Sequence, residues 1–260
     1  MRIPLYQIDA FTSRVFGGNP AAVCPLDSWL PDATMQAIGL ENNLSETAFI
    51  VRTGDDYQIR WFTPACEVDL CGHATLASGY AVFHILDPSR NTVTFSSKSG
   101  PLNVKRQDDT IIMDFPARPA KPIDPPSGLL EALNVKPSAV LKAVDYMAVF
   151  DRESDVRSLR PDYNKLAALD GVRAFICTAP GDDADFVSRF FAPKQGIPED
   201  PVTGSAHCTL IPYWSARLGR NPLRALQLSP RGGELFCEDL GDRVGIAGKA
   251  ALYLEGAIHV

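Results

Sequence analysis

Alternating apolar and polar residues predict that most of this 260-residue chain forms strands, interrupted in its first half by two stretches with helical spacing. The predicted strands of the first half cover 3–11, a segment ending at 23, 47–52, 57–62, 91–97, 101–106 and 110–115. The predicted helices cover 32–43, with Asp32 as N-cap, and 74–86.

A proline-rich stretch near the midpoint divides the chain. Five prolines between Pro116 and Pro126 favour a stiff extended linker, because proline suits neither a helix interior nor a central strand. We therefore predict one domain at 1–117 and another at 118–260, whose final strand could cross back to the first. In the second half the predicted helices are 128–133, 155–168 and one starting at 204, and the predicted strands are 139–150, 172–178, 186–191, 223–229, 233–238 and 243–247.

The two halves share short sequence matches in the same order, at separations that rise from 126 to 133 residues. The matched segments are 48–51 with 174–177, 60–64 with 189–193, 72–74 with 204–206, and 100–113 with 233–246. Four matches in order indicate an internal duplication. Each half also has a long apolar helix, which must be wrapped by other elements. We expect an α+β protein of two pseudo-symmetric domains, each a curved, barrel-like sheet around a central helix.

Both central helices are predicted to begin at a glycine, Gly72 and Gly204, after a loop with acidic and proline residues. A helix start offers unpaired N–H groups, and glycine lets a carboxylate or phosphate approach them. Duplication would place the two starts on either side of one groove between the domains. This pattern predicts two anion-binding helix starts that serve one small molecule.

Composition excludes several functional classes. A net charge of −6 without a Lys/Arg cluster argues against a nucleic-acid partner. No apolar run reaches the ~20 residues of a membrane helix, and the N-terminal residues lack the apolar region of a signal peptide. The six cysteines include no C-x-x-C pair and are interpreted as reduced thiols. We expect a cytoplasmic protein without a membrane partner.

Glu46 is the leading candidate for acid/base chemistry. It precedes the Ala48–Val51 strand, and the duplication aligns it with Val172. A carboxylate in this partly apolar setting could act as a general acid/base, or it could be a solvated residue at a strand end.

The other candidates lie in the glycine-containing loops and in one bend. His73 follows Gly72 and could donate to a substrate oxygen or have a structural role, while Ser205 holds the matching place after Gly204. Asp200 could act on a ligand or only shape its turn. Asn19 could offer its amide to a ligand or only begin a tight bend. Together the set suits proton transfer next to a carboxylate-bearing carbon.

Other constellations are weaker. Cys66, Cys71, His73, His207 and Cys208 have no common zinc-site spacing, so we predict no metal. A Cys71–Cys208 thiol pair could serve a racemase, but Cys208 lies inside its helix and is expected to be buried. The sequence has neither a Gly-rich nucleotide loop nor a G-x-S-x-G nucleophile elbow.

These segments resemble the PhzF-like family of phenazine-biosynthesis isomerases. The resemblance rests on Asp9–Phe11, Gly18–Pro20, Asn43–Phe49, Arg60–Pro64, Cys71–Thr75 and Glu199–Ala206. It implies the diaminopimelate-epimerase-like fold, a site without a cofactor and commonly a homodimer. It also implies that Glu46 transfers the proton and that His73, Asp200 and the Gly204–Ser205 turn bind substrate or relay protons.

Two departures from the family pattern affect the mechanism. Established phenazine-forming members have a small non-thiol residue where this chain has Cys71, and the two-cysteine epimerases have Cys-Gly in both halves. Here the second half has Val202-Thr203-Gly204 instead. We expect a cofactor-independent isomerase of a small carboxylate-bearing metabolite, with Glu46, His73 and Asp200 catalytic and with substrate bound by Asn19, Cys71, Gly72, His73, Thr203, Gly204 and Ser205. The alternatives are a Cys71-assisted racemase and a catalytically silent metabolite-binding protein.

Overall fold

The computed structural model describes residues 1–260, which form two compact units. The first unit comprises Met1–Phe115 and Ile246–Val260, and the second comprises Pro116–Gly245. The sequence placed the division at 117/118. No helix in either unit combines the length and apolar character needed to cross a membrane.

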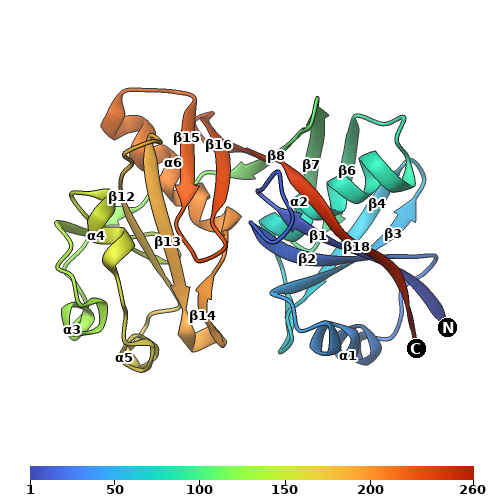
Figure 1. The fold of residues 1–260 in the computed structure, drawn as a ribbon, viewed down its shortest axis with the longest axis horizontal. Helices are drawn as coiled ribbons and strands as arrows, with labels where there is room; N and C mark the ends of the chain where they lie inside the picture. The colour runs from blue at the N-terminus through green and yellow to red at the C-terminus, as the bar shows by residue number, and fades with distance from the viewer. The chain divides into compact units, whose positions relative to one another are not determined.

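The first unit is a curved sheet with two helices (Figure 1). Its strands are β1 (Arg2–Ala10), β2 (Asn19–Leu26), β3 (Glu46–Thr53), β4 (Asp56–Phe62), β5 (Glu67–Val68), β6 (Thr92–Ser97), β7 (Gly100–Gln107), β8 (Thr110–Pro116) and β18 (Ala250–His259). The helices are α1 (Asp32–Asn42) and α2 (Gly72–Ala81), and α2 continues into a π-helical turn over Val82–Leu86. β8 ends one residue beyond the unit's boundary.

Strand pairing explains how the last strand joins this unit. The sequence pattern gave no bounds for a strand after 247, although a final strand that crosses back to the first domain was considered. This strand, β18, pairs antiparallel with β1 along almost its whole length. β1 pairs antiparallel with β2, and β2 runs parallel to β3. β3 and β4 are antiparallel, β4 and β6 are parallel, and β6, β7 and β8 form an antiparallel meander.

Helix α2 is the centre of the first unit. Every residue of α2 except Tyr80 is buried, and the helix packs against β1, β2, β3 and β7. Gly79 allows this approach, because a Cβ atom there would lie 2.9 Å from a Val104 methyl carbon. Helix α1 packs on β3 and β4 through Met35 and Ile38, within a separate apolar cluster. The helix without a polar face is therefore wrapped by strands, as predicted.

The second unit repeats this plan. Its strands are β9 (Lys121–Pro122), β10 (Ala139–Lys142), β11 (Tyr146–Val149), β12 (Phe175–Pro180), β13 (Phe186–Ala192), β14 (Ile197–Asp200), β15 (Leu223–Gln227), β16 (Gly233–Asp239) and β17 (Arg243–Gly248). Its helices are α3 (Leu129–Leu133), α4 (Glu153–Ser158), α5 (Tyr163–Ala168) and α6 (Gly204–Leu218), with a 3₁₀ turn at Pro193–Gln195. The last three residues of β17 belong to the first unit.

The order of pairing matches that of the first unit. β10 and β11 are antiparallel, β11 and β12 parallel, and β12 and β13 antiparallel. β13 then pairs antiparallel with β14 and parallel with β15, and β15 is antiparallel to β16. β3, β4, β5, α2, β6 and β7 thus correspond in order to β12, β13, β14, α6, β15 and β16. The predicted α+β fold with a duplicated unit is confirmed.

Three local predictions were wrong. The predicted strand over 139–150 is the hairpin β10–β11, which turns at Ala143–Asp145. The predicted helix over 155–168 is split into α4 and α5, because Pro161 cannot continue a helix. Asp32 is the first residue of α1 and not its N-cap, which is Pro31; its carboxylate pairs with Arg60 instead.

Candidate active site

Glu46 and His73 meet in the first unit. Glu46 is the first residue of β3, and its side chain is 13% exposed. His73 lies in the first turn of α2 and is buried. The Glu46 Oε2 and His73 Nε2 atoms are 3.2 Å apart. The two atoms do not form a hydrogen bond in this geometry, so a side-chain rotation would be needed to complete one.

The other edge of the His73 ring faces Asn19, the first residue of β2. The Asn19 side-chain amide nitrogen lies 3.2 Å from His73 Nδ1. An amide N–H donates, so Nδ1 accepts and carries no proton. The proton of the neutral ring is then on Nε2, the nitrogen that faces Glu46. Asn19 therefore sets both the tautomer and the orientation of His73.

His73 is neutral at physiological pH. Burial lowers the pKa of the imidazole to about 3, because the charged form would lose its hydration. The contact with Glu46 is consequently between a neutral ring and a carboxyl group, even though the distance is that of an ion pair. A neutral imidazole with its N–H on a carboxylate can orient that carboxylate without neutralising it.

Cys71 completes the group at the N-cap of α2. It is buried, and its Sγ atom lies 3.5 Å from His73 Nδ1. The ligand atoms of Glu46, Cys71 and His73 all lie within 4.8 Å of one another. However, Glu46 faces Nε2 while Cys71 faces Nδ1, and one metal ion binds only one nitrogen of a ring. This arrangement does not suit chelation of one ion by all three groups. It places His73 between Glu46 on one side and Asn19 and Cys71 on the other.

The five residues considered for a zinc site are divided between the two units. Cys66 is exposed and contacts Thr63, apart from the Cys71–His73 group. His207 and Cys208 lie in α6 of the second unit and are both buried. Burial raises the pKa of the Cys208 thiol to about 11, so it remains protonated and unreactive.

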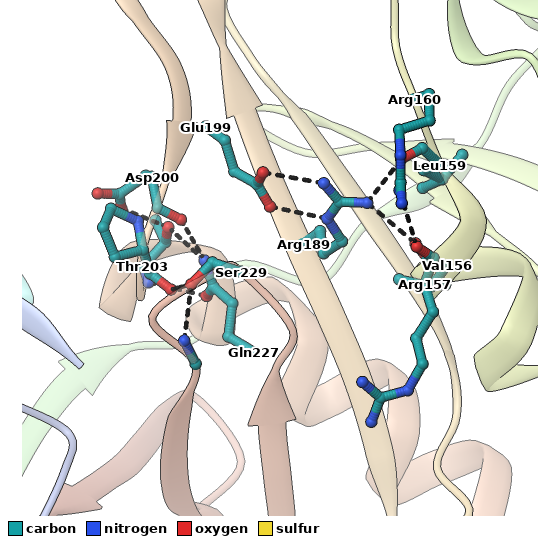
Figure 2. Close-up of polar contacts among 12 residues, drawn as sticks. Val156, Arg157, Leu159, Arg160, Arg189, Glu199, Asp200, Thr203, Gln227 and Ser229 are labelled. Atoms are coloured by element: carbon teal, nitrogen blue, oxygen red, sulfur yellow. Dashed lines mark hydrogen bonds and ion pairs between the residues drawn. The ribbon is translucent and has the colours of Figure 1, made fainter. Parts of the chain in front are cut away.

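In the second unit, Asp200 and Thr203 form a compact turn before α6 (Figure 2). Asp200 ends β14 and Thr203 is the N-cap of α6, and both residues are buried. The Thr203 hydroxyl donates to Asp200 Oδ2 over 2.5 Å. Threonine at an N-cap usually bonds the helix backbone; here its hydroxyl orients a carboxylate.

The starts of α2 and α6 are alike in one respect. Neither N-cap residue, Cys71 or Thr203, caps the helix through its side chain. The first N–H groups of a helix, here at Gly72–His73 and Gly204–Ser205, have no partner within the helix. Both helices begin at the predicted glycines, and Ser205 is partly exposed.

A buried glutamine that the sequence analysis missed holds the Asp200 turn. Gln227 is the last residue of β15 and is 1% exposed. Its Nε2 donates to the Asp200 carbonyl at 2.8 Å and to Thr203 Oγ1 at 3.2 Å, while its Oε1 accepts from the Thr203 N–H at 2.8 Å. Sequence gives little signal for this role, since one polar residue in an apolar strand has many explanations.

Two arginine–glutamate pairs were also missed. Arg60 on β4 binds Glu67 on β5, and Arg189 on β13 binds Glu199 on β14 (Figure 2). Their signal was present: the arginines were matched in the duplication, and Glu67 and Glu199 share the spacing of Gly72 and Gly204.

Comparison with known proteins gives one consistent result. Residues 8–256 match the family model described as phenazine biosynthesis-like protein. A Pseudomonas aeruginosa protein named as an uncharacterized isomerase is 51% identical over 260 residues, covering 100% of both chains. The human phenazine biosynthesis-like domain-containing protein is 40% identical over 287 residues, covering 99% of each.

Solved structures agree with this result. The crystal structure of a PhzF-family protein from Enterococcus faecalis has a TM-score of 0.97 and 47% identity, covering 100% of both chains. A hydroxyproline epimerase from Agrobacterium vitis has a TM-score of 0.63 at 10% identity, covering 99% of this chain and 92% of its own. That second likeness shows a shared fold alone.

Proposed function

The chain belongs to the phenazine biosynthesis-like family, and from this premise we propose that it is a cofactor-independent isomerase that moves a proton on a small carboxylate-bearing metabolite. The observation that carries the proposal is the Asn19–His73–Glu46 chain, in which a buried neutral imidazole directs its N–H toward a carboxylate. A partly buried carboxylate, oriented but not neutralised, is suited to be a general base.

In the proposed step, the Glu46 carboxylate removes a proton from a carbon next to the substrate's carboxylate. The electron pair of that C–H bond delocalises into the adjacent π system, so the substrate becomes an enolate-like anion and Glu46 becomes a carboxylic acid. Glu46 then returns the proton to another carbon of the same π system. Substrate and product have the same atoms, and Glu46 is regenerated.

His73 and Asn19 support this transfer. The His73 Nε2–H stabilises Glu46 while it is a carboxylate, and the low pKa of the ring prevents His73 from taking the proton itself. The N–H groups of Gly72 and His73 at the start of α2 would bind a carboxylate oxygen of the substrate, where negative charge grows during the reaction. We assign Cys71 to the wall around this carboxylate.

We propose that Asp200, Thr203, Gly204 and Ser205 of the second unit also bind substrate. The Thr203 hydroxyl fixes the Asp200 carboxylate in one orientation, which suits a group that accepts a hydrogen bond from a substrate amine or hydroxyl. The Gly204 and Ser205 N–H groups at the start of α6 would bind an anionic group.

The test is deuterium incorporation from D₂O into a panel of small carboxylic acids, followed by NMR. The wild-type protein should exchange the proton on the carbon next to the carboxylate in at least one acid. Glu46→Gln should slow that exchange by ~10² or more while leaving folding intact. Glu41→Gln, at an exposed position of α1, is the matched control and should exchange at the wild-type rate.

Full activity in Glu46→Gln would remove Glu46 from the mechanism. If no acid of a broad panel exchanged with the wild-type protein, the alternative of a catalytically silent binding protein would be favoured. A second candidate function, a Cys71-assisted racemase, is supported by the 3.5 Å approach of Cys71 Sγ to His73 Nδ1.

A further inference from the structure

The two arginine–glutamate pairs occupy the same place in each duplicated unit. In both, an arginine on the second strand of a β-hairpin binds a glutamate on the short strand that precedes the glycine-started helix. Arg60 Nε and Nη2 donate to the two Glu67 oxygens at 2.7 and 2.8 Å. Arg189 Nε and Nη2 donate to the two Glu199 oxygens at 2.7 and 2.9 Å.

A second bond is duplicated with the pairs. Ser99 Oγ donates to the Asp69 carbonyl at 2.8 Å, and Ser229 Oγ donates to the Pro201 carbonyl at 2.8 Å. Both carbonyls belong to residues two positions after the paired glutamates. The loop before each helix is therefore held twice, by its glutamate side chain and by a backbone carbonyl.

The Arg189–Glu199 pair is the more deeply buried of the two. Its side chains are 8% and 11% exposed, whereas those of Arg60 and Glu67 are 19% and 17% exposed. Arg189 also donates to the carbonyls of Val156 and Leu159 at the end of α4, at 3.3 and 2.9 Å (Figure 2). Arg189 on β13 thus donates four hydrogen bonds, two to Glu199 on β14 and two to carbonyls at the end of α4.

Burial of the Arg189–Glu199 pair costs free energy, because both charged groups lose their hydration. A buried ion pair adds little stability over apolar side chains of similar size, but its planar fork fixes the position of both partners. Glu199 is followed directly by Asp200. Any movement of Glu199 would shift the Asp200 carboxylate, and active-site groups need placement within about 0.5 Å.

We propose that Arg189 and Glu199 are positioning residues for Asp200, and that their ion pair fixes the turn over residues 200–203 in the geometry that substrate binding requires. That the fixed turn serves substrate binding rests on the role proposed for Asp200. That the ion pair fixes the turn does not depend on this role. Arg60 and Glu67 are the corresponding pair for the loop that leads to Cys71, Gly72 and His73.

The decisive variant replaces the pair by apolar residues, Arg189→Met with Glu199→Leu. Apolar replacement avoids leaving a buried charge alone, so the melting temperature should stay within a few degrees of the wild-type value. Amide hydrogen exchange in residues 200–205 should nevertheless become at least ~10-fold faster. Exchange in β12 is the internal reference and should not change.

Glu199→Gln is the conservative variant. It keeps the shape and one oxygen acceptor but loses the counter-charge of Arg189 and its second acceptor, so it should restore slow exchange in residues 200–205 only in part. The matched control is Glu234→Gln, which removes one partner of the exposed Arg224–Glu234 pair in the same unit. This control should leave exchange in residues 200–205 as in the wild-type protein.

Substrate turnover distinguishes this inference from the proposed function. With an acid that the wild-type protein deuterates, the double variant should raise KM or lower kcat by at least ~10-fold, and Glu199→Gln should recover part of the loss. If residues 200–205 are protected from amide hydrogen exchange equally well in the double variant and in the wild-type protein, the inference is overturned. Faster exchange in these residues with unchanged turnover would support fixation of the turn but overturn the role of Asp200. If the wild-type protein deuterates no acid, the hydrogen-exchange result alone decides whether the pair fixes the turn.

Discussion

In the first unit, the strand that enters the β-hairpin begins with Glu46. The second unit has the buried Val172 where the sequence match aligns with Glu46, and the buried Ala174 where strand pairing aligns with it. The second unit instead carries its acid in the loop, where Asp200 aligns with Val68 of the first. The two units share strand order, helix start and arginine–glutamate pair, so these features are what the fold needs. The acids differ between the units, which is consistent with the roles proposed for them.

The surroundings of the two aligned positions explain why the acid is tolerated in only one. Glu46 has the His73 ring at 3.2 Å and retains partial solvent exposure. Val172 is 4% exposed and packs in an apolar cluster with Leu169 and Phe175. The start of this hairpin can thus hold a carboxylate in one unit and apolar core side chains in the other, depending on whether a polar partner and water are within reach.

Exchanging the two residues gives the largest expected effect. Val172→Glu should destabilise the protein by about 3–5 kcal/mol, because a carboxyl group would be buried among apolar side chains without a partner. Glu46→Val should change the unfolding free energy by less than about 1 kcal/mol while abolishing deuterium incorporation into substrate. Urea unfolding at pH 7 measures the first quantity and NMR exchange the second.

Val172→Thr is the control for the first variant, since it adds a small hydroxyl without a charge and should cost clearly less than Val172→Glu. Equal unfolding free energies for Val172→Glu and the wild-type protein would show that water reaches this position, and the contrast between the units would fail.

Much of this arrangement was predictable, and the comparisons confirm the family, the α+β duplicated fold and the isomerase class. Local pattern was enough where a residue's role depends on neighbours in sequence. The helix starts at Gly72 and Gly204 were found in this way. The sequence match that aligned Glu46 with Val172 is two residues away from the strand register, which aligns Glu46 with Ala174. The roles of the site residues, the homodimer and the cytoplasmic location stay predictions.

The sequence could not predict which residues from distant segments come into contact. The tautomer of His73 depends on Asn19, which lies 54 positions away. The Asp200 turn depends on Gln227, which lies 27 positions away. A one-dimensional pattern shows that a residue is polar but not which buried partner satisfies it.

Lowering the pH should reduce the unfolding free energy because of the buried His73 imidazole. This effect is expected to be intermediate in size among the predictions. The pKa of His73 is lowered from 6.5 to about 3 in the folded protein, so between these values the unfolded state binds more protons and stability falls as pH falls. His73→Gln should remove this dependence. Between pH 7 and pH 4 the wild-type protein should lose about 3 kcal/mol more unfolding free energy than the variant.

His207 should behave in the same direction, because burial lowers its pKa to about 4. His259→Gln, at an exposed position in β18, is the matched control and should keep the wild-type dependence. An identical loss in His73→Gln and the wild-type protein would mean that His73 is accessible to water in the folded state.

The smallest expected effect concerns Cys71, and it separates the two mechanisms. If Glu46 is the base and Cys71 only lines its surroundings, Cys71→Ser should change deuterium incorporation by less than about 3-fold, since serine is nearly the same size. Thiol alkylation of the wild-type protein would add bulk beside His73 and is therefore a poorer test. A loss of 10²-fold or more in Cys71→Ser would instead favour the racemase.

The second unit offers Thr203 and not a thiol at the aligned position, and the Thr203 hydroxyl already donates to Asp200. A two-thiol mechanism thus lacks its second member there, which makes the small effect the expected one.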